Sequence, residues 1–221
     1  MVAIAPEIQP APPMVEEIVE KIAEETATPL RLAGSDRTEQ RVTYLDRTWE
    51  QFKLIEQGLD GLTGLRLFYF DEKVEILMPG KLHELFKKII AVLIEAFLFD
   101  RDIEFEALGS MTRKAEGLAS GEPDESYQIG EFTLVLEVIF TRSSLNKLAL
   151  YATLGIHEVW FWEDGVLKIS HLRGGTYEDA SHSQIPELAA IDIQALSKCI
   201  FIGEKSFLKA RKEFLAAHPK S

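Results

Sequence analysis

Two acids and one lysine are the residues of this chain whose types and spacing could do chemistry together. Glu137 interrupts the apolar run 132–140, Asp124 lies upstream of that run, and Lys147 lies downstream of it. A carboxylate inside a buried apolar strand is expensive to desolvate unless a cation or hydrogen-bond donors meet it. These three residues therefore predict a metal site of the kind that cleaves phosphodiesters.

The residue types match what that reaction requires. An anionic phosphate must be neutralised, a water must be activated, and the leaving oxygen must be stabilised. Mg²⁺ or Mn²⁺ held by carboxylates can do all three, because Mg²⁺ prefers oxygen ligands and keeps several waters. We expect Asp124 and Glu137 to be the metal ligands and Lys147 to stabilise the charge that develops on the phosphate.

Structural roles without a metal remain open for each of these residues. Glu137 could be a buried acid paired with Lys147 or Arg113. Asp124 could be a turn residue after a proline, and Lys147 could be a solvated helix residue. Tyr151, four residues after Lys147, would share its helical face and either line the same pocket or pack as a core aromatic.

Other residues that often carry chemistry give weaker signals. His83 begins a long apolar-periodic segment, and we interpret it as a structural histidine. Cys199 has no neighbouring histidine or base in the sequence and is interpreted as an inert buried thiol. Since it is the one cysteine of the chain, it cannot form an internal disulfide, and a reducing, cytoplasmic setting is expected.

The hydrophobic pattern predicts a sheet with helices around it. Run 132–140 has the length and composition of a strand buried on both faces. Hydroxyls at 141–144 offer N-caps for the helix that follows. The remaining expected elements are helices over 48–57 with a capping box, 82–99, 145–154, 193–199 and 204–217, hairpins over 65–78 and 156–171, short strands at 103–108, 110–113 and 177, and a loop over 114–122.

Composition and charge limit the possible domain organisation and binding partners of the chain. We expect an acidic, Pro-rich extension over 1–40, with helical spacing at 15–26, and one domain over 41–221. No segment approaches the roughly 18 apolar residues of a membrane span, and the start of the chain does not resemble a signal peptide. The net charge of −12 disfavours tight binding of duplex DNA, although segment 203–221 carries five bases against two acids.

Several stretches resemble a known nuclease family. The sequence 121–124, Gly-Glu-Pro-Asp, followed by Leu-Val-Leu-Glu-Val at 134–138 is similar to the Pro-Asp…Glu pattern of the PD-(D/E)XK nuclease superfamily. Stretches 143–151 and 154–160 resemble the Uma-two family of restriction-endonuclease-like proteins, over about residues 45–200. The resemblance implies an α/β (α+β) fold with a restriction-endonuclease-like core, a mixed β-sheet flanked by helices.

The resemblance also implies that Asp124 and Glu137 are metal ligands and that Lys147 is the basic catalytic partner. The superfamily pattern places its lysine two residues after the second acid, where this chain has Ile139. A helix that starts near the end of the strand could instead direct Lys147 back over the site. The superfamily also often has a glutamate on its first core helix, for which Glu84 and Glu95 are the candidates.

These observations predict a metal-dependent endonuclease that hydrolyses DNA phosphodiester bonds. A homodimer is expected, because cutting both strands usually needs two sites. Two alternatives stay open. One is a catalytically inactive interaction module that has kept the nuclease fold, and the other is a hydrolase of small phosphoesters, which would suit an acidic surface better than DNA does.

Overall fold

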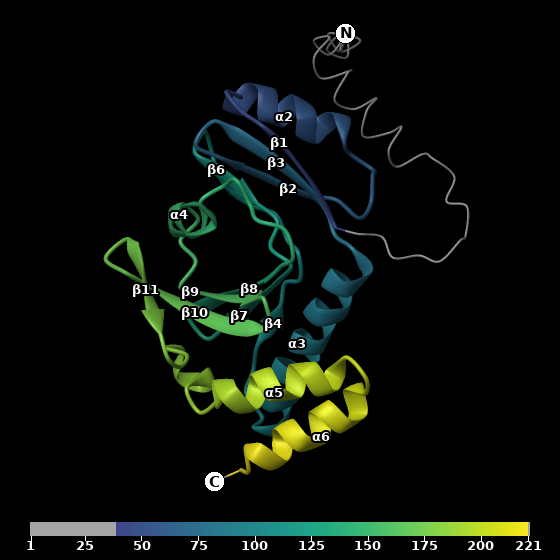
Figure 1. The fold of residues 1–221 in the computed structure, drawn as a ribbon. Helices are drawn as coiled ribbons and strands as arrows, with labels where there is room; N and C mark the ends of the chain where they lie inside the picture. Colours follow the sequence, from purple (N-terminus) through teal and green to yellow (C-terminus); the bar gives the residue numbers. More distant parts are fainter. Residues whose placement is uncertain (1–38, 221) are drawn as a thin grey trace, which may run out of the picture.

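Two β-sheets face one another across an apolar layer, with one short helix at the side of that layer (Figure 1). The computed structural model describes residues 39–220, so the helix expected over 15–26 and most of the acidic extension lie outside the described residues. The mixed sheet and flanking helices agree with a restriction-endonuclease-like core, which confirms the expected fold class.

The first sheet is antiparallel throughout and has the order β1-β3-β2-β6-β5. Its β2–β3 hairpin was expected, and its turn residues Asp71 and Glu72 both have positive φ, as the two-residue turn of a hairpin requires. Its strands are β1 Gln40–Tyr44, β2 Arg66–Phe70, β3 Lys73–Met78, β5 Arg113–Ala115 and β6 Ala119–Gly121.

The second sheet is mixed and has the order β11-β10-β9-β8-β7-β4. Its β8 and β9 strands are parallel, and its other neighbouring strands are antiparallel. The expected strand over 132–140 is β8, which lies inside the sheet between β7 and β9. The strands are β4 Glu106–Ala107, β7 Glu125–Ile129, β8 Phe132–Ile139, β9 Glu158–Glu163, β10 Val166–Arg173 and β11 Thr176–Ala180.

Helices cover the outer faces of both sheets. Helix α2 begins after the expected capping box, in which Thr48 and Gln51 satisfy each other's backbone N–H groups, and it packs on the first sheet. Helices α3 and α5 cover the second sheet, α6 packs on α3 and α5, and α4 lies beside the layer between the sheets (Figure 1). Their bounds are α2 Trp49–Gly58, α3 Lys81–Asp100, α4 Lys147–Thr153, α5 Ile193–Gly203 and α6 Phe207–Ala217, with a 3₁₀ turn at Pro186–Leu188.

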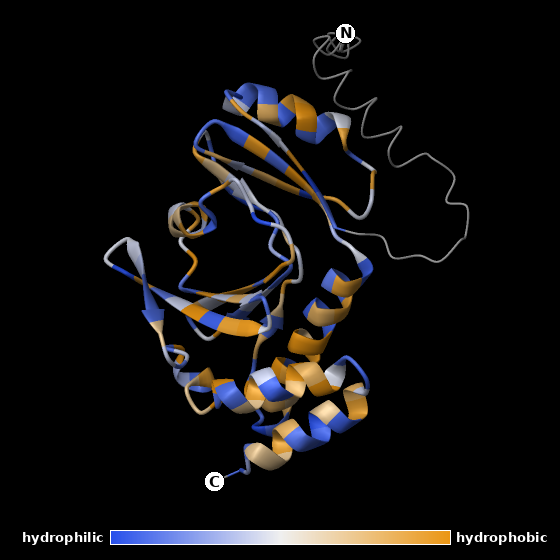
Figure 2. Cartoon of the chain, viewed as in Figure 1, coloured by the Kyte–Doolittle hydropathy of each residue, from blue (hydrophilic) through white to orange (hydrophobic). Residues whose placement is uncertain are grey.

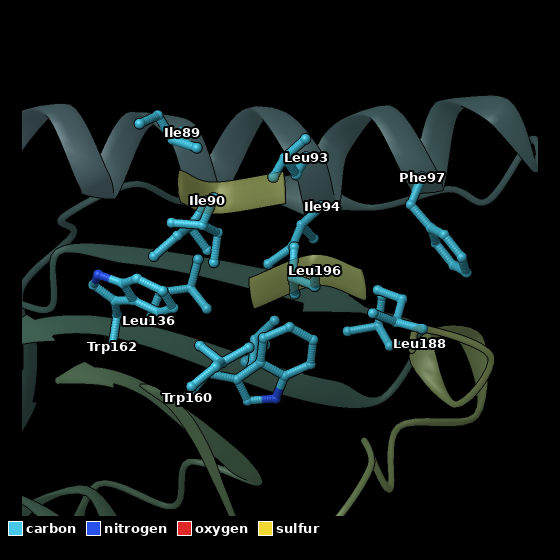
Figure 3. Packing of buried hydrophobic residues seen from close by; sticks show 14 of the residues in the cluster. Ile89, Ile90, Leu93, Ile94, Phe97, Leu136, Trp160, Trp162, Leu188 and Leu196 are labelled. Atoms are coloured by element: carbon cyan, nitrogen blue, oxygen red, sulfur yellow. The ribbon is translucent and has the colours of Figure 1, made fainter. Parts of the chain in front are cut away.

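The largest apolar core lies between α3 and the second sheet. Figure 3 shows Ile90 and Ile94 of α3 pointing toward Trp160 and Leu136 of the sheet. Apolar residues concentrate along α3, whereas α6 alternates apolar and polar segments, as expected for a helix with one exposed face (Figure 2). No helix within residues 39–220 is long and apolar enough to cross a membrane.

Three local expectations were wrong. Segment 114–122 is not a loop throughout, because β5 and β6 form a tight hairpin there around Gly117, which has positive φ. The strand expected at 103–108 is reduced to the two residues of β4, and the strand expected at 110–113 is displaced to β5. Helix α4 begins at Lys147 rather than at 145, and its N-cap is Asn146, whose side chain accepts the Ala149 N–H, rather than a hydroxyl of segment 141–144.

Alternation along β8 decides which face Glu137 occupies. Leu136 and Val138 belong to the core under α3, whereas Val135 belongs to the layer between the sheets. Since successive side chains of a strand point to opposite faces, Glu137 shares the face of Val135. The buried acid therefore faces α4 and the first sheet rather than the large core.

Candidate active site

Strand pairing brings Asp124 and Glu137 next to each other. Strand β7 pairs antiparallel with β8, with Glu125 opposite Leu136, so the residue before Glu125 lies opposite Glu137. Residues directly opposite on antiparallel strands share a face, with Cβ atoms about 4.5–5.5 Å apart. Both side chains are buried, with Asp124 1% and Glu137 3% exposed.

Helix α4 directs two polar groups to one oxygen of Glu137. Lys147 Nζ lies 3.4 Å from Glu137 Oε1, and the Tyr151 hydroxyl donates a hydrogen bond to the same oxygen. Lys147 also lies over the ring of Phe68, with Nζ 2.9 Å from the ring centroid. Because residues four apart share a helical face, a helix that starts at Lys147 presents Lys147 and Tyr151 together.

Asp124 is held by the backbone and by a histidine. Its Oδ2 accepts the Val138 N–H at 2.8 Å, and its Oδ1 lies 2.8 Å from His83 Nε2. The other ring nitrogen, His83 Nδ1, lies 2.6 Å from Glu39 Oε2. An imidazolium satisfies both carboxylates, since both of its nitrogens are donors. Although burial alone would lower the pKa of His83, the two carboxylates raise it to about 9.

Burial and charge shift the two acids in opposite directions. Burial would raise the pKa of Asp124, but the hydrogen bond and charge of His83 and the Val138 N–H outweigh burial and lower it. Burial raises the pKa of Glu137, and the Lys147 ammonium opposes that shift only in part. Burial also lowers the pKa of Lys147. The Glu137–Lys147 pair is therefore poorly compensated in its charged form.

The structure does not bring the two candidate helix glutamates to these acids. Glu84 is half exposed and pairs with Lys87 at 2.7 Å, whereas Glu95 accepts a hydrogen bond from Tyr127 at 3.1 Å. The residue of α3 that contacts Asp124 is His83. Of the two cations considered as partners of Glu137, Lys147 contacts it, and no contact to Arg113 is found among the described residues.

Sequence reasoning missed a second group of charged residues around the site. Glu75 on β3 is fully buried and paired with Arg41 of β1, and Glu39 lies just before β1. Arg41 also lies 3.6 Å from Glu39. No local pattern marks these residues, because apart from the Arg41–Glu39 pair their contacts join positions between 34 and 102 residues apart. His83 was interpreted as a structural histidine, and its contact with Asp124 was not predicted. For Tyr151, the first of the two alternatives holds, since its hydroxyl reaches Glu137.

The donor set is compatible with a hard divalent cation. Asp124 and Glu137 offer carboxylate oxygens from neighbouring strands, and no described residue donates a hydrogen bond to Glu137 Oε2. Among residues 39–220, no group of three or more His, Cys, Asp or Glu side chains is arranged to hold a metal ion. An ion at this position would therefore take its other ligands from water or substrate, as Mg²⁺ commonly does.

Comparison with known proteins places the chain in a family. The Uma2 family model, described as "Putative restriction endonuclease", matches residues 49–196, which is well over half of the chain. This protein belongs to the Uma2 family. The matched range includes Asp124, Glu137 and Lys147 and excludes Glu39 and Arg41. A comparison with curated proteins gave no match. Membership of Uma2 supports a nuclease-like function and confirms the resemblance read from the sequence.

Proposed function

We propose that this Uma2 protein is a metal-dependent endonuclease that hydrolyses DNA phosphodiester bonds. The observation that carries the proposal is the convergence of Asp124, Glu137 and Lys147 on one face of the second sheet. Two carboxylates beside an ammonium supply the ligand types and the positive charge that phosphoryl transfer to water requires.

Each residue of the site has a distinct task in this proposal. Asp124 and Glu137 would hold Mg²⁺ or Mn²⁺, which would supply Lewis-acid chemistry to the phosphate and to water. The Val138 N–H and His83 orient the Asp124 carboxylate. Tyr151 orients Glu137 through Oε1, and no described residue donates a hydrogen bond to Oε2. Lys147 places its ammonium where negative charge increases in the transition state.

The buried charges around the site favour a bound cation. Four carboxylates meet three bases in this region, and with all four acids ionised and all three bases protonated the set has one negative charge in excess. The carboxylates are Glu39, Glu75, Asp124 and Glu137, and the bases are Arg41, His83 and Lys147. Buried charge without a partner is strongly unfavourable, so a divalent ion would relieve the excess.

The charge of the chain and the number of sites bear on the proposed DNA substrate and on the assembly. The net charge of −12 opposes approach to a polyanion, so DNA binding would depend on the bound metal and on local bases. A homodimer would supply two sites for cutting both strands. The acidic surface also supports a second candidate function, the hydrolysis of small phosphoesters.

The proposal is tested by nicking of supercoiled plasmid with purified protein in Mg²⁺ and in chelator. We expect Mg²⁺-dependent nicking that is lost in Glu137→Gln and retained in Glu95→Gln, a matched change of a glutamate hydrogen-bonded by another tyrosine. Equal nicking by the wild type and Glu137→Gln would contradict the assignment, because the activity would then come from elsewhere or from a contaminant.

Two further measurements separate the alternatives. Hydrolysis of a small phosphodiester such as bis-p-nitrophenyl phosphate, without plasmid nicking, would favour the small-phosphoester hydrolase. Calorimetric titration with Mg²⁺ tests the inactive module, since a module that has lost its chemistry should give no heat of binding that depends on Glu137. Absence of plasmid nicking together with absence of Mg²⁺ binding would refute the enzymatic proposal.

A further inference from the structure

The segment that joins β8 to α4 is held against the first sheet by a buried carboxylate. Glu75 of β3 is 0% exposed, and its two oxygens accept the Ser143 hydroxyl at 3.0 and 2.8 Å. Glu75 Oε2 also accepts the Ser144 N–H at 3.1 Å. Since Ser143 Oγ in turn accepts the Leu145 N–H at 3.1 Å, one carboxylate organises three consecutive residues.

Strand β1 adds contacts to the same segment. Arg41 pairs with Glu75 and donates through Nε to Thr141 Oγ1 at 3.2 Å. The hydroxyls of Thr43 and Ser144 lie 2.8 Å apart. The segment is therefore attached to β1 and β3 along most of its length. Phe140 packs near Phe86 and Leu145 is buried in the layer between the sheets, so apolar contacts hold the two ends of the segment. The polar contacts hold residues 141–144 between them.

This attachment has a direct consequence for the site. Segment 140–146 ends at the N-cap Asn146, and the next residue is Lys147, whose ammonium lies 3.4 Å from Glu137. A shift of the segment would move the start of α4 and carry the ammonium away from the acid. Displacement of a catalytic group by about 1 Å can reduce a rate about 100-fold.

We propose that Glu75 is a positioning residue that places the Lys147 ammonium on Glu137 by anchoring segment 140–146 to the first sheet. Its catalytic meaning rests on the proposed function, but the placement itself does not. The competing explanation is that packing of α4 alone places Lys147, since Leu150 and Tyr151 of that helix are fully buried.

The chain offers a matched control elsewhere in the structure. Glu158 of β9 is also 0% exposed and accepts a serine hydroxyl, that of Ser183, at 2.6 Å and the Gln184 N–H at 2.7 Å. Ser183 Oγ accepts the N–H two residues later, as Ser143 Oγ does. Glu158→Gln therefore repeats the chemistry of Glu75→Gln at a place that does not lead to Lys147.

The test combines lysine labelling with amide hydrogen exchange in the full-length protein. Acetylation of Lys147 by an N-hydroxysuccinimide ester, read by mass spectrometry, should be slow in the wild type because the side chain is only 8% exposed. Glu75→Gln and Ser143→Ala should both speed it about tenfold or more and speed exchange in 141–146, through local opening of the segment. Ser143→Ala keeps the Glu75 charge, which raises the pKa of Lys147, so faster labelling in that variant reports movement of the segment rather than easier loss of the ammonium proton. Glu158→Gln should instead speed exchange around residue 184 and leave Lys147 protected.

Unchanged protection of Lys147 in Glu75→Gln would overturn the proposal, as would equal exposure of Lys147 in Glu158→Gln. If the glutamate variants do not fold, Ser143→Ala and Ser183→Ala provide the same comparison with smaller changes. Plasmid nicking by Glu75→Gln should fall 10- to 100-fold. If Lys147 becomes exposed in Glu75→Gln and nicking is unchanged, the positioning role in catalysis is overturned. If the wild type does not nick at all, the proposed function fails, but the labelling result still tests the placement of Lys147 by Glu75.

Discussion

Removal of the Lys147 ammonium tests whether Glu137 depends on a cation. In Lys147→Met, Glu137 stays buried with only the Tyr151 hydroxyl as a donor, and the apolar stem over Phe68 is kept. The side chains of Lys147 and Glu137 are 8% and 4% exposed, so solvent screens the pair little. Loss of one member of a buried ion pair costs about 3–5 kcal/mol, so we expect Lys147→Met to lower the free energy of unfolding by that amount.

A double-mutant cycle completes the test, with Glu137→Gln measured alone and in combination with Lys147→Met. The double variant contains neither buried charge, so its loss of stability should be smaller than the sum of the single losses by on the order of 2–3 kcal/mol. The loss in Lys147→Met should also shrink at acidic pH. Burial already raises the pKa of Glu137, and the acid can then take up a proton instead of remaining an unpaired anion.

Urea unfolding in chelator and in Mg²⁺ measures these differences. Mg²⁺ should stabilise Lys147→Met more than it stabilises the wild type, because a bound cation would replace the missing ammonium. Mg²⁺ should not stabilise the Glu137→Gln variant in this way. Additive single losses, within about 0.5 kcal/mol, would refute the reasoning, since residues that do not interact show no coupling energy.

Three other predictions concern single residues. In metal-free protein, His83→Gln should lower the free energy of unfolding by up to about 3 kcal/mol at pH 6 and by much less at pH 9.5. The folded-state pKa of His83 is raised from 6.5 to about 9, so the stability that protonated His83 contributes is complete below pH 6.5 and is lost as the pH rises through 9. Urea unfolding across this pH range measures the difference. Cys199, which is 3% exposed and has a pKa raised by burial, should react with an aromatic disulfide only in denaturant. Gly203→Ala should lower the melting temperature, because its Cβ would lie 2.5 Å from Ile89 Cγ2 and overpacking costs about 1–3 kcal/mol. Ile89→Leu, which has no second γ carbon, should restore part of the loss.

The elements that depend on local sequence were predictable. The capping box at Thr48 and the Asp-Gly turn of the β9–β10 hairpin are set by a few adjacent residues, and both were confirmed. The β5–β6 hairpin was missed because its strands are three residues each and rich in small or polar side chains. Such strands have no apolar alternation, so their pairing comes from tertiary context.

The same division applies to the candidate site. Glu137, Lys147 and Tyr151 lie within 14 positions of each other, so strand and helix periodicity were enough to suggest that they meet. Glu75 and Arg41 reach the site from the first sheet, and only the packing of one sheet on the other brings them there. The residues proposed for chemistry are therefore local in sequence, whereas the residues proposed to position them are not.

The place of the lysine gives a last prediction. Ile139 lies two residues after Glu137 on β8, so it is on the same face of the sheet, and it packs against the layer between the sheets. A lysine at 139 would reach the site from the strand, as the superfamily pattern has it, while Lys147 reaches it from α4. We expect Ile139→Lys to restore part of the Mg²⁺-dependent nicking lost in Lys147→Met, because the transition state requires a positive charge beside Glu137 rather than a particular helix. Ile139→Met in the same background is the control for size. Equal nicking with lysine and with methionine at 139 would mean that Lys147 acts through something other than its charge.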